Sequence, residues 1–171
     1  MERLTEQALE FDKVKSYLTQ LVYSPLGKVH VEGLTATTDK ELIERQLAEV
    51  SELKEIRALH HPLPIEGFHD IREALLRSRV ENSILDPAEL RQIYDTLRAG
   101  RSIQKQMKEI EAPEYPLIRE KVERLVIVED LEKAIFRSVD DEGDILDSAS
   151  PKLKQIRKDL RLAREKIQSW L

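Results

Sequence analysis

The stretch PKLKQIRKDLRLAREKIQSWL, residues 151–171, decides the fold predicted for this chain. Its apolar residues recur at alternating spacings of three and four, which is the pattern of a heptad repeat. These residues, called the seam below, are Leu153, Ile156, Leu160, Ala163, Ile167 and Trp170. Most other positions are too polar to bury, so the stretch predicts a helix that pairs with a second helix in a coiled coil. Because no Gly, Asn or Pro follows Trp170, we expect a helical arm that continues past the last residue.

The composition favours helices along the whole chain. Of 171 residues, 40% are hydrophobic and 36% are charged, whereas about 25% is usual for charged residues. Glycine is rare, with 5 residues, and aromatic residues make up 5%, which argues against an all-β fold. We predict an all-α fold: a multi-helix bundle with at most a small β-hairpin near residues 138–148 and a terminal coiled-coil lever helix. The predicted domains are a helical core at 1–147 and the start of a long lever helix at 148–171.

Capping residues and prolines divide the predicted core into helices. Each predicted start combines a capping side chain with a proline or with a glutamate three residues later. The starts are Ser24-Pro25, Thr38 with Glu41, Asp70, Asp86-Pro87 with Glu89, and Ser150-Pro151. Apolar residues at helical spacing follow each start, and we expect two of them, Leu47 and Leu97, to be buried.

Several classes of protein are excluded by what the sequence lacks. It has no cysteine, so it forms neither a disulfide nor a thiolate zinc site. No apolar run approaches the ~20 residues of a membrane span, and the first residues do not form a signal peptide, so we expect a cytoplasmic protein with no membrane partner. The net charge of -5 argues against nucleic acid coating the whole surface, since phosphate binding needs clustered cations.

Two groups of residues suggest a metal site, and both are better explained without one. The acidic segment DDEGDILD, residues 140–147, offers many oxygen ligands, but a calcium loop counted from Gly143 would end at Ala149 instead of a glutamate. A solvated hairpin is the favoured interpretation. The histidines His60, His61 and His69 lack the HExxH spacing of a zinc helix. We therefore predict no metal ligand in this chain.

The terminal helix also carries a run of cations. Between Lys152 and Lys166 there are seven Lys or Arg residues against two acids. A solvated coiled-coil surface is the favoured interpretation, because coiled coils carry such charges routinely. The alternative is contact with a phosphate backbone, for which the candidate residues are Arg157, Lys158, Arg161 and Arg164. No nucleophile motif, GxxxxGK[ST] loop or GxGxxG fingerprint occurs, so we predict no catalytic or cofactor-binding residue and no enzyme activity in the chain by itself.

Five strings taken together resemble one protein family. They are LEFDKV (9–14), SPLG (24–27), GFHDIREAL (67–75), LDPAEL (85–90) and, most specific, DEGDILDSASPKLKQIR (141–157). They resemble the start of the second bacterial MutS paralogue, which carries a C-terminal Smr endonuclease domain and lacks the mismatch-recognition and connector domains. The resemblance runs in register over nearly the whole chain. It implies that the chain is a helical core and lever region whose terminal helix rises toward a clamp.

The resemblance also implies a function for the parent protein. It implies an ATP-driven homodimer, with ATP and Mg²⁺ bound beyond residue 171, that acts on branched DNA and restrains recombination. Some members instead resemble factors that split collided ribosomes, so rRNA and DNA are competing partners. The chain itself would transmit the nucleotide state to the clamp. The alternative is a helical scaffold or coiled-coil protein-interaction module with no nucleic-acid role; a GxxxxGK[ST] loop further along the reading frame would select the first interpretation.

Overall fold

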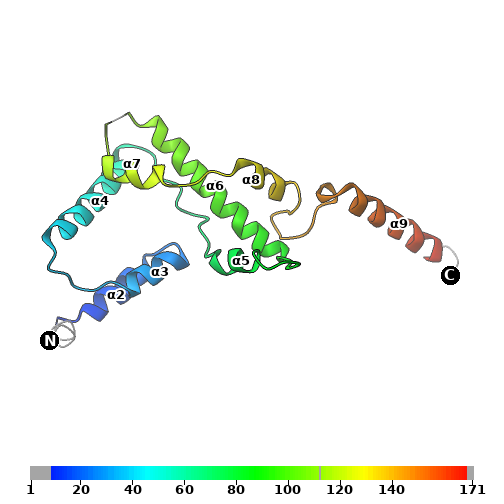
Figure 1. Cartoon of the computed structure of the whole chain (residues 1–171), viewed down its shortest axis with the longest axis horizontal. Coiled ribbons are helices and arrows are strands. Elements are labelled where there is room, and N and C mark those ends of the chain that lie inside the picture. Colours follow the sequence, from blue (N-terminus) through cyan, green and yellow to red (C-terminus); the bar gives the residue numbers. More distant parts are fainter. Residues whose placement is uncertain (1–8, 112, 169–171) are drawn as a thin grey trace. The chain divides into compact units, whose positions relative to one another are not determined.

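A computed structural model describes residues 9–111 and 113–168 (Figure 1). Within these residues the chain forms α-helices and one 3₁₀ turn, η1, and no strand, which confirms the all-α prediction. The elements are α2 (Phe11–Gln20), α3 (Pro25–Glu32), α4 (Lys40–Leu59), α5 (Arg72–Arg77), α6 (Pro87–Glu109), α7 (Pro116–Glu123), α8 (Glu129–Phe136), η1 (Asp147–Ala149) and α9 (Pro151–Gln168).

Local sequence signals set several helix starts as predicted. The side chain of Ser24 accepts a hydrogen bond from the backbone N–H of Gly27 at 3.1 Å, and Pro25 is the first residue of α3. At the start of α6, the Glu89 carboxylate accepts a hydrogen bond from the backbone N–H of Asp86 at 3.0 Å. These bonds satisfy N–H groups that a helix start leaves without an intrahelical acceptor.

Three predicted helix ends are wrong by a few residues. Helix α4 is capped by Asp39, whose carboxylate accepts from the N–H of Leu42 at 3.1 Å, and Thr38 lies outside the helix. Helix α5 starts after Ile71 with no side-chain cap bond, so Asp70 is not its cap. Apolar residues at helical spacing from Leu117 to Val128 predict a longer helix, but α7 ends at Glu123. The periodicity of apolar residues shows that a helix is present but does not show at which residue it begins or ends.

The described residues form two compact units. Unit 1 contains the segments up to residue 70 and from 96 to 127, and unit 2 contains residues 71–95 and the chain from 128 onward. The boundary falls within α6. The predicted division into a core at 1–147 and a lever from 148 follows a different criterion, the start of the heptad pattern, and stays a prediction.

The core of unit 1 is built from α4, α6 and α7. Ile56 of α4 is 0% exposed and Met107 of α6 is 2% exposed. The cluster around them consists of Ile103, Ile110, Tyr115, Ile118 and Val122, with Leu63, Phe68 and Leu125 packed against it. The spacings of three and four within α6 and α7 place these side chains on one face of each helix.

Helix α4 presents a polar side to α7. The carboxylate of Glu52 accepts hydrogen bonds from the backbone N–H groups of Leu117, at 3.2 Å, and Ile118, at 2.8 Å. A carboxylate at this place satisfies free N–H groups and interacts favourably with the helix dipole. Salt bridges from Arg45 to Glu120, at 2.7 Å, and from Lys121 to Glu49, at 3.1 Å, lie beside it.

The side of α4 that meets α7 carries Glu49, Glu52 and Ile56, and most of the apolar residues elsewhere on α4 are exposed. Leu47 is 62% exposed, so the prediction that it is buried is wrong. Leu42, Val50 and Leu53 are exposed as well. Leu97, the second residue expected in the core, is half-buried. The apolar residues Leu42, Leu47, Val50 and Leu53 are called the open face of α4 below.

The acidic turn of unit 2 is a small chain reversal stabilised by hydrogen bonds within the turn. An isolated antiparallel bridge joins Val139 and Ile145, as the predicted hairpin near 138–148 requires. The carboxylate of Asp140 accepts hydrogen bonds from the N–H groups of Glu142, at 3.1 Å, and Asp144, at 2.7 Å. Gly143 has φ of +85°, which favours glycine over any residue with a Cβ atom.

Tyr115 gives unit 1 an expected sensitivity to alkaline pH. Burial raises the pKa of Tyr115 above its ordinary value of 10.0, and the carboxylates of Glu114, Glu55 and Glu52 raise it further. The folded state therefore holds the phenol proton more tightly than the unfolded state. Stability falls as the pH rises above 10.0, where the phenol of the unfolded chain begins to lose its proton. We expect Tyr115→Phe to lose less stability than the wild type above pH ~10. Urea unfolding at neutral and alkaline pH measures the difference; equal losses in both proteins would contradict it.

Candidate interaction surface on the terminal helix

The start of α9 is joined to the preceding turn, η1, by a capping bond, packing contacts and a salt bridge. The side chain of Ser150 accepts from the N–H of Leu153 at 3.5 Å, and Pro151 takes the first helical position, as predicted. The preceding turn η1 packs against the start of the helix. A salt bridge of 2.7 Å joins Arg157 of α9 to Asp147 of η1. These contacts join the first turns of α9 to the turn that precedes it.

The seam of α9 is largely uncovered. Ile156 is 53% exposed, Leu160 51% and Ile167 64%. Leu153 is half-buried beside the junction and Ala163 is exposed, while Trp170 lies outside the described residues. The structure thus places the seam on one open face of a regular helix, and the predicted pairing with a second helix stays a prediction.

The four cations proposed for nucleic-acid contact are all on this helix and all exposed: Arg157, Lys158, Arg161 and Arg164. At 100° per residue, Arg157, Arg161 and Arg164 lie on one side of α9, next to the seam, and Lys158 lies farther round. Such a row can meet a row of acidic groups or phosphates at low desolvation cost.

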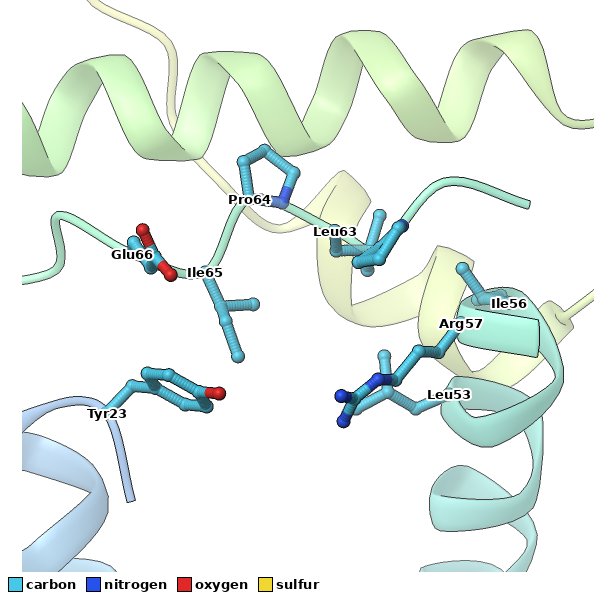
Figure 2. A pocket seen from close by; sticks show the side chains of 9 residues that line it. Tyr23, Leu53, Ile56, Arg57, Leu63, Pro64, Ile65 and Glu66 are labelled. Carbon is cyan, nitrogen blue, oxygen red and sulfur yellow. The ribbon is translucent and has the colours of Figure 1, made fainter. Parts of the chain in front are cut away.

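Sequence reasoning missed a pocket in unit 1. Figure 2 shows its lining, which comes from the chain around Tyr23, the last turns of α4 and the loop at 62–66. Its volume is about 400 Å³. The hydroxyl of Tyr23 and the guanidinium of Arg57 point into it. In the sequence, Pro62 and Pro64 predict only a loop that ends at Gly67. The pocket exists because residues distant in sequence meet.

The pocket lining suits binding better than catalysis. Its apolar part includes Leu53, Ile56 and Ile65, and its polar groups are a phenol, a guanidinium and the carboxylate of Glu66. A phenol and a guanidinium without an activated nucleophile beside them do not form the nucleophile and base of a hydrolytic site. Across residues 9–111 and 113–168 no three His, Asp or Glu side chains are grouped to hold a metal. No helix within those ranges is both long and apolar enough to cross a membrane.

The chain is similar over its whole length to MutS2 endonucleases. It is 34% identical over 174 residues to endonuclease MutS2 of Halalkalibacterium halodurans and 36% identical over 174 residues to that of Bacillus velezensis. Identity to the putative endonuclease MutS2 of Bacillus subtilis is 35% over 174 residues. Each alignment covers 100% of this chain and 22% of the relative, so the chain spans about a fifth of the length of these proteins. No family model matches the chain.

Proposed function

We propose that this chain is the core and lever region of a MutS2-like protein, in which α9 is the base of a lever that transmits the nucleotide state to a clamp. The observation that carries the proposal is similarity over the whole chain to about a fifth of each MutS2 endonuclease. The five strings that resemble the family, above all residues 141–157, agree with it. That string includes the acidic turn except Asp140, together with η1 and the start of α9, which form the junction of the proposed lever.

The open apolar faces support a role inside a larger protein. The open face of α4 and the seam of α9 expose many large aliphatic side chains. Monomeric proteins rarely expose contiguous apolar patches of this kind unless another surface covers them. In our proposal the remainder of the parent chain, with its ATPase and clamp, covers part of these faces.

The parent protein in this proposal is a cytoplasmic, homodimeric ATPase and endonuclease. It acts either on branched DNA, restraining recombination, or on collided ribosomes, where rRNA is the contact. ATP and Mg²⁺ belong to the remainder of the parent, because none of the 171 residues forms a GxxxxGK[ST] loop. The residues present here do not fit a nucleotide site, and we assign the chain by itself no catalytic step.

A second candidate function is a scaffold or coiled-coil interaction module without a nucleic-acid role. The observation that favours it is the exposure of the seam, since an open heptad face serves any helical partner equally well. The two functions differ in whether the junction before α9 matters for nucleotide coupling.

A graft tests the proposed lever. In Bacillus subtilis MutS2, the segment that matches this chain is replaced by these residues, and ATP hydrolysis is measured alone, with branched DNA and with ribosomes. We expect insertion of two glycines between Ala149 and Ser150 to leave basal hydrolysis unchanged and to abolish stimulation by the nucleic acid. The reason is that the insertion interrupts the junction of η1 and α9. If only branched DNA or only ribosomes stimulate ATP hydrolysis, that addition is identified as the partner.

The matched control inserts two glycines in the exposed stretch at 35–38, between α3 and α4. It should leave the stimulation intact. If both insertions act alike, or if the junction insertion leaves stimulation unchanged, the lever proposal is wrong and the scaffold function is favoured.

A further inference from the structure

The open seam of α9 has a defined set of charged neighbours. The seam positions come in pairs three residues apart, such as Leu153 and Ile156. In a heptad, the residue just before the first member of each pair and the residue just after the second lie beside the partner helix. Before the seam stand Lys152, Asp159 and Lys166, and after it stand Arg157 and Arg164. Four of these five flanking residues are cationic. Any helix that covers the seam must place its own flanking residues next to them.

A second copy of α9 is a poor fit to this pattern. In an antiparallel pair, like positions face each other. In one register Lys152 faces Lys166, while Arg157 and Asp159 each face their own copy, so every flanking contact is repulsive. One heptad away, Arg157 faces Arg164 and Asp159 faces Lys166, which gives one repulsive contact for each attractive one. In a parallel pair, Lys152 would face Arg157 and Asp159 would face Arg164, which gives one repulsive contact for each attractive one. Like-charge contacts of this type disfavour a pairing.

One contact in the structure shows which charge these flanks accept. The guanidinium of Arg157 binds the Asp147 carboxylate at 2.7 Å, beside the first turns of the seam. Arg164, two turns further along the same side, has no hydrogen-bond or ion-pair partner among residues 9–111 and 113–168. It is therefore available to a carboxylate from another helix.

We propose that the seam of α9 is a docking surface for an amphipathic partner helix whose flanking residues are acidic. The partner lays its aliphatic residues on Ile156, Leu160 and Ile167, and its Glu or Asp side chains meet the flanking cations. Burial of the seam supplies the affinity, and the charges select an acidic partner over a second copy. This inference uses only the residues of α9 and does not depend on the proposed function.

Two synthetic helical peptides test the proposal. Both carry the same Leu and Ile seam, and the flanking positions are all Glu in one and all Lys in the other. Binding to the 171-residue chain is measured by fluorescence anisotropy. We expect the Glu peptide to bind at least about tenfold more tightly, with the difference shrinking at high salt. The net charge of -5 favours the Lys peptide through long-range attraction, so a preference for Glu must come from the flanks.

Two pairs of variants locate the binding. Leu160→Lys with Ile167→Lys should abolish binding of the Glu peptide, whereas Leu162→Lys, off the seam and also exposed, should not change it. Arg164→Glu should weaken the Glu peptide about tenfold. Lys158→Glu makes the same charge change on the side away from the seam and should have little effect. All of these side chains are exposed, so far-UV circular dichroism should show unchanged helicity.

Four results would overturn the proposal. The first is equal binding of both peptides, and the second is binding of neither. The third is sedimentation of the chain as a dimer that Leu160→Lys dissociates, because a second copy then covers the seam. The fourth is binding of duplex DNA or RNA that Arg164→Glu abolishes while the peptide preference is absent, because the cations then serve phosphates.

Discussion

Ile56→Ala should destabilise unit 1 by about 2–5 kcal/mol, the range for removing a large buried aliphatic side chain. Ile56 is 0% exposed and lies among core residues of α6 and α7, including Met107 and Ile118. The change removes methyl groups and leaves a cavity where α4 meets the other two helices. Since α7 is only eight residues long, it depends on this contact to stay folded. Urea unfolding followed by circular dichroism measures the loss.

The matched control is Leu47→Ala, about two and a half turns earlier on the same helix. Leu47 is 62% exposed, so its truncation should change stability by less than about 0.5 kcal/mol. Equal losses for the two variants would mean that the open face of α4 is covered in solution. A loss near zero for Ile56→Ala would mean that the core of unit 1 is elsewhere.

Local signals predicted most of the fold correctly. Ser24-Pro25, Asp86-Pro87 with Glu89, and Ser150-Pro151 each contain the atoms that satisfy a helix start, so their effect does not depend on the rest of the chain. The acidic turn is equally local, because Asp140 bonds within its own turn. Such short-range geometry is what a sequence encodes most directly.

The burial of α4 was not predictable in the same way. Its apolar residues lie on more than one side, and periodicity alone does not say which side meets α7. The choice rests on Glu49 and Glu52, which bind Lys121 and the start of α7 from more than 60 residues away in the chain. The sequence shows these carboxylates but not their partners, so Leu47 was placed in the core instead of on the surface.

The seam of α9 could be predicted from the sequence and the pocket of unit 1 could not, for the same reason. The seam and the cations of α9 share one helix, so their mutual positions follow from 3.6 residues per turn. The pocket of unit 1 needs Tyr23, Arg57 and Ile65 to meet from three segments. Only the fold of unit 1 brings those segments together, and no spacing of residues in the sequence predicts the pocket.

Arg119→Met should destabilise unit 1 by about 2 kcal/mol, since hydrogen bonds from a charged donor contribute about 1.5–3 kcal/mol. The guanidinium of Arg119, on α7, donates to the backbone carbonyls of Met107, at 3.2 Å, and Ile110, at 3.1 Å. It thereby closes the end of α6, where carbonyls lack intrahelical donors and the helix dipole favours a cation. Its Nε is buried with no partner among residues 9–111 and 113–168, which lowers the net gain.

Methionine keeps most of the aliphatic length of Arg119 and removes the guanidinium together with its charge, so the loss reports the capping bonds and the charge together. Arg124→Met, at the exposed end of α7, is the matched control and should change stability by less than about 0.5 kcal/mol. Arg119→Lys should recover part of the loss, because an ammonium keeps the charge but cannot reach both carbonyls in the fork geometry of a guanidinium. Urea midpoints of the three variants decide between explanations. If Arg119→Lys matches the wild type, charge alone stabilises the end of α6; if Arg119→Met does too, the carbonyls of Met107 and Ile110 are satisfied by water and α7 is held by its apolar face and by Glu52.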